Sequence, residues 1–241
     1  MKVKLEGVVN VGNDTVTKEE FESELNNWLK SKGWTYQSLE DINSPYLKYL
    51  QGNYVFDSCS LMGGAIFDSG QDKRYFLSKI WDPNLPVAAA FLMNPSYANE
   101  LRGDATIDFL MGYLRNRSYG GIIVINTSSI VKPSNVTKAD FPKTDKENIE
   151  VILNVLGRVK TVILGWGGSG NKYAVPHFSA NLKDKLELNI EKIYAFEIGG
   201  KETKTGRQLY PCHPSPTGNK NKYINKSLKK IDIKQLRKIL N

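Results

Sequence analysis

The sequence predicts an α/β protein, folded as a three-layer α/β/α sandwich around a central, mostly parallel four-stranded sheet. Four apolar runs are continuous rather than alternating, which indicates strands covered on both faces, as in a parallel sheet. A stretch of helical pattern separates each run from the next. The strands are expected at residues 87–93, 121–126, 161–165 and 192–196. The crossover helices are expected at residues 106–117, 146–156 and about 176–186.

Further elements are expected at both ends of this main domain, which covers residues 46–241. Residues 65–68 and 74–77 read as the two strands of a hairpin, because the turn-forming sequence Ser-Gly-Gln-Asp lies between them at 69–72. At the other end, residues 224–240 are expected to form a basic helix that closes the chain.

Residues 1–45 are expected to form a small separate strand–helix–strand element. Residues 3–11 read as a strand, and Thr17-Lys18-Glu19-Glu20 is a capping-box pattern that opens a helix. Gly33 ends this helix, and residues 34–37 read as the second strand. A unit this small must dock on another surface to be stable. The apolar face of the helix comprises Phe21, Leu25, Trp28 and Leu29.

Composition sets bounds on the class of protein. The chain has 241 residues, of which 40% are hydrophobic and 24% charged, and this is ordinary globular composition. The sequence contains no run of about 18 apolar residues, so no membrane span is predicted. Its first residues lack the apolar core of a signal peptide. Two cysteines, Cys59 and Cys212, are too few for a disulfide framework. We therefore expect a cytoplasmic monomer.

The net charge of +8 is the first indication of a partner. A positive surface attracts polyanions by releasing their counterions, so the charge favours contact with double-stranded or locally unpaired DNA. The alternative is a solvated lysine-rich C-terminal helix without a nucleic-acid partner. The densest basic stretch comprises Lys220, Lys222, Lys226, Lys229, Lys230, Lys234, Arg237 and Lys238.

Polar side chains follow the expected strands at the edge where open parallel sheets bind ligands. Asn94 comes just after the first strand, Asn126 ends the second, and a Gly-Trp-Gly sequence ends the third. His213 follows the fourth, in a loop stiffened by Pro211, Pro214 and Pro216. These residues are expected to converge. A histidine and two asparagines do not make a metal site, so neither a metal nor another cofactor is expected.

Four of these motifs, in this order, resemble the uracil-DNA glycosylase superfamily. Residues 121–127, Gly-Ile-Ile-Val-Ile-Asn-Thr, look like the strand that reads the base in that superfamily, and residues 161–167 look like its strand ending in Leu-Trp-Gly. His213-Pro214-Ser215-Pro216 is identical to its His-Pro-Ser-Pro loop. Asn94-Pro95 lies where those enzymes carry Asp-Pro or, in the mismatch-specific thymine/uracil branch, Asn-Pro. The resemblance covers about residues 87–225.

A second resemblance is to a bacterial and phage domain family, domain-of-unknown-function family 1643, which reads as a divergent relative of the same fold. It rests on five short matches: Arg74-Tyr75-Phe76-Leu77, Trp81-Asp82-Pro83, Met93-Asn94-Pro95-Ser96, Asp104-Ala105-Thr106-Ile107 and Ser118-Tyr119-Gly120-Gly121.

The glycosylase resemblance implies a role for each residue at the expected sheet edge. His213 would donate a hydrogen bond to the departing base, Asn126 would read the base edge, and Asn94 would position the attacking water. A carboxamide cannot take a proton, so Asp104 is a candidate to assist, although it could instead be a helix N-cap.

The remaining candidates would surround an extruded base or the DNA backbone. Phe67, Tyr97 and Trp166 could stack on the base, although core packing is the alternative for each, and Ser96 could contact the substrate. The second histidine, His177, is expected to be structural. The residues expected to contact DNA are Ser215, Thr217, Lys220 and Lys222.

The expected activity is therefore that of a DNA glycosylase acting on a modified or mismatched pyrimidine to leave an abasic site. Hypermodified phage bases are plausible substrates, which would make the protein an antiviral defence factor. Two alternatives stay open. One is a hydrolase or transferase acting on free nucleotides or nucleosides, and the other is a catalytically silent nucleic-acid-binding module on the same fold.

Overall fold

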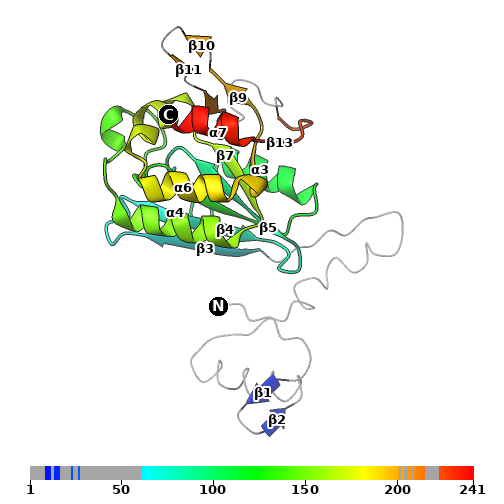
Figure 1. Ribbon diagram of the computed structural model, residues 1–241. Coiled ribbons are helices and arrows are strands. Elements are labelled where there is room, and N and C mark those ends of the chain that lie inside the picture. Colours follow the sequence, from blue (N-terminus) through cyan, green and yellow to red (C-terminus); the bar gives the residue numbers. More distant parts are fainter. Residues whose placement is uncertain are drawn as a thin grey trace. The chain divides into compact units, whose positions relative to one another are not determined.

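The computed structural model describes residues 61–200, 202–203, 206–207, 209–214 and 223–241, together with Val9–Val11, Asp14–Val16, Ser23 and Asn27 (Figure 1). The chain divides into two compact units, Met1–Ser58 and Cys59–Asn241. In the first unit, strands β1 (Val9–Val11) and β2 (Asp14–Val16) pair antiparallel. The rest of the expected N-terminal element, including its boundary at residue 45, lies outside the described residues.

The second unit is built on a seven-stranded sheet with the strand order β13-β8-β7-β5-β6-β4-β3. Four neighbouring strands of this sheet are mutually parallel, as predicted: β5 (Val87–Leu92), β6 (Gly121–Asn126), β7 (Thr161–Gly165) and β8 (Ile193–Ala195). Three antiparallel strands extend this core: β3 (Met62–Phe67), β4 (Arg74–Ile80) and β13 (Lys229–Lys230). The expected hairpin is confirmed as β3–β4, and because β4 pairs with β6, it joins the main sheet.

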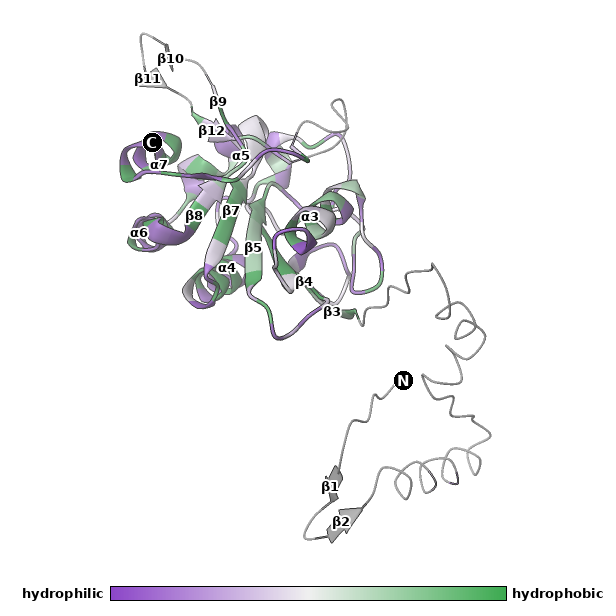
Figure 2. Cartoon of the chain, turned by 90° about the vertical axis from the view of Figure 1, so that its right-hand side faces the viewer, coloured by the Kyte–Doolittle hydropathy of each residue, from purple (hydrophilic) through white to green (hydrophobic). Residues whose placement is uncertain are grey.

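Helices cover both faces of this sheet, which confirms the three-layer α/β/α architecture (Figures 1 and 2). On one face, α3 (Ala105–Arg115) packs with the β5 residues Ala88 and Ala90. The alternate residues Ala89 and Phe91 pack on the other face with the remaining long helices. Strand β5 is buried on both sides, which is why its apolar run is continuous. The helices of the second face are α4 (Lys146–Arg158), α6 (Ala180–Leu188) and α7 (Ile233–Leu240).

Two helical predictions need correction. The helix expected at about 176–186 is replaced by α5 (Gly167–Tyr173), a 3-10 turn η3 (Val175–His177) and α6, which begins after the Ser179 N-cap. The basic C-terminal helix begins at Ile233 rather than at residue 224. There β13 pairs with β8, and Asp232 then caps α7 by accepting a hydrogen bond from the Gln235 N–H. Edge pairing therefore overrides the helical pattern of the preceding residues.

Short elements connect the sheet to the predicted histidine loop. After β8, strand β9 (Ile198–Gly199) pairs antiparallel with β12 (Tyr210–Pro211), which leads directly into Cys212 and His213. Within the described residues, no helix is long and apolar enough to cross a membrane. The other short elements are β10 (Glu202–Thr203), β11 (Gly206–Arg207), η2 (Lys138–Asp140) and η4 (Ile190–Lys192).

Candidate active site at the carboxyl edge of the sheet

The register of the parallel strands aligns the ends that were expected to carry the site. Leu92 of β5 is paired with Asn126 of β6 on one side and with Gly165 of β7 on the other. Asn126 is therefore the last residue of β6 and lies beside Leu92, which precedes Asn94 by two residues. The Trp166–Gly167 turn starts on the opposite side of β5, so these three segments meet at one edge of the sheet.

His213 reaches this edge because Gly165 leaves room for its loop and Gly167 allows the backbone turn beside it. A Cβ on Gly165 would lie 2.8 Å from Cδ of Pro214, and a Cβ on Gly167 would lie 3.4 Å from Cβ of His213. Gly167 also has φ +69°, a conformation that side chains other than glycine rarely adopt. The Gly-Trp-Gly sequence at the end of β7 therefore allows the histidine loop to pack directly against the strand end.

The imidazole of His213 is held in its neutral form. Burial lowers its pKa to about 4, and the nearby negative charge of Asp104 opposes this shift without cancelling it. At neutral pH the ring carries one N–H donor and one acceptor nitrogen. It can therefore donate a hydrogen bond without bringing a positive charge.

Asp104 occupies the N-cap of α3, the alternative that its sequence position allowed. Its Oδ1 accepts hydrogen bonds from the backbone N–H groups of Thr106 (2.8 Å) and Ile107 (2.9 Å). Its Oδ2 accepts a hydrogen bond from the Ser96 hydroxyl. The structure thus brings Ser96 and Asp104 together, and the carboxylate has a structural role in starting the helix.

Asn94 is fixed by its amide nitrogen. Nδ2 donates to the backbone carbonyls of Lys132 (2.6 Å) and Pro95 (3.0 Å). The surrounding loop is fastened to the end of β6, because the Thr127 hydroxyl donates to the Met93 carbonyl (2.6 Å). With both amide hydrogens engaged, Oδ1 is left to accept, and no described residue donates to it. A carboxamide oxygen held this way could accept a hydrogen bond from a water molecule.

Asn126 is buried, with 2% of its surface exposed, and its partner is Arg74, which was not among the expected site residues. Nη2 of Arg74 donates to Oδ1 of Asn126 (3.3 Å), and Nη1 of Arg74 donates to the Ala98 carbonyl (2.6 Å). Arg74 is also 2% exposed. Burial lowers the pKa of its guanidinium to about 10, with the charge of Asp104 acting in the opposite direction. The signal in the sequence that could have pointed to Arg74 was its position as the first residue of the Arg-Tyr-x-Leu match.

Arg74, Ser96, Asp104, Asn126 and His213 form what we call the α3 cluster. Its members come from β4, the loop after β5, the start of α3, the end of β6 and the loop after β12. The negative charge of Asp104 influences the pKa of both Arg74 and His213, which places the carboxylate within electrostatic reach of both groups.

The three aromatic candidates lie in different environments. Tyr97 is 72% exposed, so its ring is accessible. Phe67 is half-buried and pairs with Arg74 across the β3–β4 ladder, beside the α3 cluster. Trp166 is fully buried, its ring contacts Phe91 and Phe178, and Nε1 donates to Oδ1 of Asn171 (3.1 Å). With no exposed face, Trp166 serves core packing rather than stacking on a base.

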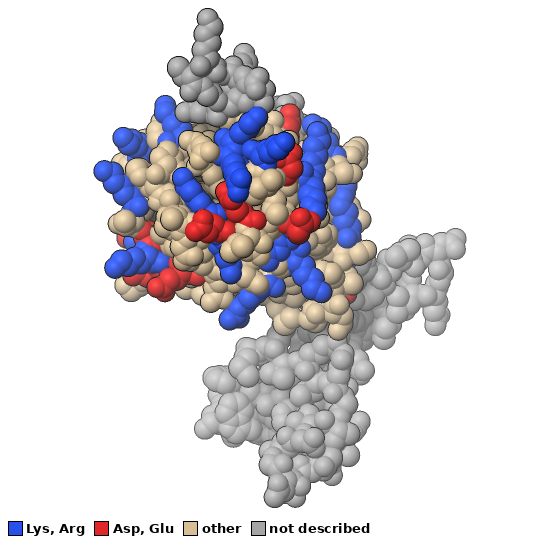
Figure 3. Space-filling model, viewed as in Figure 1, with Lys and Arg blue, Asp and Glu red and all other residues tan. Residues whose placement is uncertain are grey.

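The expected DNA contacts Ser215, Thr217, Lys220 and Lys222 lie outside the described residues. Lys and Arg side chains are spread over the face shown in Figure 3, with Asp and Glu among them. Several basic residues near the C-terminus are engaged in ion pairs: Lys226 with Glu197 (3.6 Å), Lys230 with Glu191, and Arg237 with Glu187 (2.7 Å). Their charge is therefore partly balanced within the protein.

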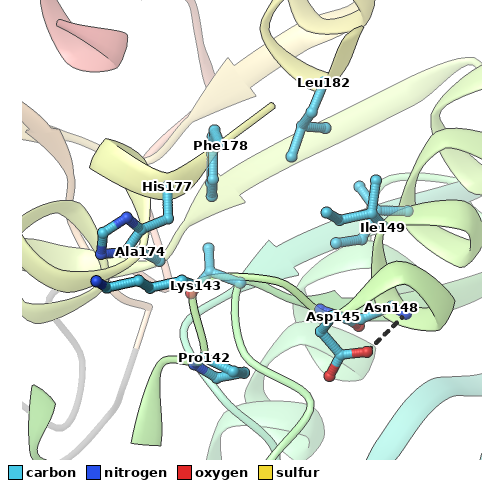
Figure 4. A pocket seen from close by; sticks show the side chains of 11 residues that line it. Pro142, Lys143, Asp145, Asn148, Ile149, Ala174, His177, Phe178 and Leu182 are labelled. Carbon is cyan, nitrogen blue, oxygen red and sulfur yellow. Dashed lines mark hydrogen bonds between the residues drawn. The ribbon is translucent and has the colours of Figure 1, made fainter. Parts of the chain in front are cut away.

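A second polar group lies at the start of α4, and we call Lys73, Ser129, Asp145, Asn148 and His177 the α4 cluster. Asp145, Asn148 and His177 line a cavity that also contacts Thr127 and Phe178 (Figure 4). The space open to water there is about 30 Å³, room for only one or two water molecules. Nδ2 of Asn148 donates to the Asn126 carbonyl (3.0 Å), which connects the two clusters through the backbone of β6.

Among the residues that the structure describes, no group of three or more His, Cys, Asp or Glu side chains is arranged to hold a metal ion.

Comparison with protein families gives a match that spans the whole α3 cluster. The model of the family described as "Protein of unknown function (DUF1643)" matches residues 74–215. The chain belongs to the DUF1643 family. The DUF1643 match begins at Arg74 and ends just beyond His213 and Pro214, so it contains every member of the α3 cluster as well as Asn94. Among curated proteins, none matches the chain.

Proposed function

We propose that the protein is a DNA glycosylase that hydrolyses the N-glycosidic bond of a flipped-out modified or mismatched pyrimidine. The observation that carries this proposal is the neutral imidazole of His213, packed against the end of β7 at the same sheet edge as Asn94 and Asn126. The resemblance of the strand-end motifs to the uracil-DNA glycosylase superfamily supports the same conclusion.

The proposed reaction breaks the C1′–N bond, and the bonding electron pair leaves with the base. His213 donates a hydrogen bond to a pyrimidine oxygen as negative charge develops there. Oδ1 of Asn94 accepts a hydrogen bond from the water that attacks C1′ on the oxocarbenium-like sugar. The water oxygen becomes the new hydroxyl at C1′, and its proton finally neutralises the base.

DNA is favoured over free nucleotides by the net charge of +8. Since several C-terminal basic residues are already paired with Glu residues, the contribution of charge to binding should come from the remaining lysines and arginines. A defence role against phages with hypermodified pyrimidines would follow if such bases are the ones accepted.

The deciding experiment incubates the protein with phage DNAs of different base content and then with alkali, which converts abasic sites into strand breaks. Breaks are expected in at least one modified DNA, and the variant Asn94→Ala should lose cleavage about 100-fold or more while retaining DNA binding. Asn171→Ala is the matched control, because this asparagine hydrogen-bonds Trp166 and no member of the α3 cluster. Full activity in Asn94→Ala would contradict the assigned role of the water-positioning residue.

A second candidate, the catalytically silent DNA-binding module, is favoured by one observation. The oxygens of Asp104 are committed to the N-cap of α3 and to Ser96, so this carboxylate is poorly placed to act as a base. The two candidates differ in one outcome. Salt-dependent DNA binding without strand breaks in any DNA would support the silent module. Release of base from free nucleotides would instead support a hydrolase or transferase acting on free nucleotides or nucleosides.

A further inference from the structure

Arg74 is the least expected member of the α3 cluster, because a guanidinium with 2% exposure needs partners for all of its donors. Nη1 and Nη2 have partners, in the Ala98 carbonyl and in Oδ1 of Asn126. Nε is buried and has no hydrogen-bond partner. Because Nε and Nη2 lie on the same edge of the planar guanidinium, the unpaired donor faces the side on which Asn126 lies.

Asn126 has the same deficiency. Its Oδ1 must face Arg74, since an arginine can only donate, and this fixes the orientation of the carboxamide. Nδ2 then faces away, is buried, and has no partner. The pair therefore presents two unsatisfied buried donors and no free acceptor. Such groups are rare in folded proteins, and each needs an explanation, of which a role in binding or catalysis is one.

The balance of charges in the cluster allows it to bind an anion. Arg74 is positive, Asp104 is negative, and His213 is neutral, so the cluster alone has no net charge. Without Arg74, a base leaving as an anion would meet the carboxylate of Asp104 with nothing to offset the repulsion. Burial strengthens both effects, because charges interact more strongly away from water.

A short segment, residues 97–103, covers the Arg74–Asn126 pair through Ala98, which is 1% exposed. Its large side chains are not part of this cover, since Tyr97 is 72% and Leu101 is 83% exposed. The segment is fastened by two carbonyls, that of Ala98 to Arg74 and that of Glu100 to Nζ of Lys79 (2.5 Å). Because the pair is buried beneath this segment, binding of a base at Arg74 would require the segment to move aside.

We propose that Arg74 is a further catalytic residue of the glycosylase. Its Nε and the Nδ2 of Asn126 bind acceptor atoms of the extruded base, and its guanidinium charge stabilises that base as it leaves with the electron pair of the C1′–N bond. This inference rests on the proposed function and deepens it. It assigns the site to bases that present acceptor atoms on the bound edge and leave as anions. The positive charge of Arg74 also offsets the absence of charge on His213 and the weak activation of water by Asn94.

The experiment measures how the single-turnover rate depends on the acidity of the leaving base. The substrates are duplexes carrying thymine, uracil or 5-fluorouracil opposite guanine, in which the acidity at N1 rises in that order. Arg74→Met keeps the length of the side chain and removes its charge and donors. We expect a loss of about 100- to 1,000-fold on the poorest leaving group and about 10-fold or less on the best, so that the slope of log rate against N1 pKa steepens. Arg74→Lys keeps the charge and should give an intermediate slope.

Lys79→Met is the matched control, because Lys79 is a second buried cation on β4, with 1% exposure, and it fastens the same segment. It should lower stability and leave the slope unchanged. A uniform loss across the three substrates in Arg74→Met, as a purely structural anchor would give, overturns the inference while leaving the proposed function intact. No cleavage of any of the three duplexes by the unaltered protein overturns the inference as well, whereas the phage-DNA assay decides the proposed function separately.

Discussion

The α3 cluster and the α4 cluster lie on either side of the end of β6 and are built from similar parts. In each, an aspartate caps a helix and accepts a hydrogen bond from a serine hydroxyl, Asp104 from Ser96 and Asp145 from Ser129. Each also contains a histidine and a buried asparagine with an unpaired polar atom.

The clusters differ in the exposure of their cation and in the kind of polar atom that lacks a partner. In the α3 cluster the cation is the buried Arg74, and the unpaired atoms are donors. In the α4 cluster the cation is Lys73, whose side chain is 38% exposed at 3.6 Å from Asp145, and the unpaired atom is the acceptor Oδ1 of Asn148. Similar local motifs can therefore start a helix in one place and also build a site for a negatively charged group in another.

The largest expected difference between the clusters is in activity. His213→Ala should lower DNA cleavage by about 100- to 1,000-fold, because it removes a preorganised donor to the departing base. His177→Ala should change the rate by less than about 3-fold, since that ring lines the α4 cavity. Single-turnover cleavage with matched DNA binding measures both. Equal losses in the two variants would remove the functional distinction between the clusters.

The next difference is in the pH dependence of stability. The pKa of His213 is about 4 in the folded protein and near 6.5 in an unfolded chain. Between these values the unfolded chain binds the proton and the folded one does not, so stability falls as the pH drops from about 6.5 to 4. The loss should reach up to about 3 kcal/mol and be complete below pH 4.

Denaturant titrations of the unaltered protein, His213→Gln and His177→Gln across this pH range isolate the effect from that of the carboxylates. Only His213→Gln should lose the histidine-dependent fall in the free energy of unfolding between about pH 6.5 and 4. If this variant followed the same pH profile as the unaltered protein, the burial of a neutral His213 would be contradicted.

The smallest difference concerns the two capping aspartates. An asparagine can still cap a helix, so Asp104→Asn and Asp145→Asn test charge rather than capping. Asp104→Asn should destabilise by about 2 kcal/mol, because Arg74 is buried and loses its nearby counter-charge. Asp145→Asn should cost less than about 1 kcal/mol, because Lys73 is partly solvated. Free energies of unfolding from denaturant titrations check both values, and the reverse order would contradict the comparison.

Much of the architecture could be predicted because its signal is local. The strands expected at 121–126 and 161–165 match β6 and β7 residue for residue, since each is an uninterrupted apolar run ended by a polar or glycine residue. The helix expected at 146–156 matches α4 closely because its apolar residues recur at helical spacing and Asp145 provides an N-cap. Burial on both faces leaves a pattern that the sequence carries by itself.

The start of the C-terminal helix and the extent of the sheet were not predicted, because a distant segment decided the local structure there. Residues 229–230 form a strand because the edge of β8 offers backbone partners, and the helix starts only at Ile233. The β3–β4 hairpin was expected, but its joining of the main sheet depends on pairing between β4 and β6. Such pairings link residues far apart in the chain, and no local periodicity encodes them.

The sequence by itself determined the parallel core, the sheet edge where polar residues gather, and the prominence of Asn94, Asn126 and His213. Only the tertiary structure decided which side chains complete them. It placed Asp104 at a helix cap, enclosed Trp166 in the core, and brought Arg74 to Asn126 across 52 positions of the chain. The physical reason is that burial and hydrogen bonding between distant residues set the charge and the unsatisfied donors of the site, and these properties emerge only when the strands pair.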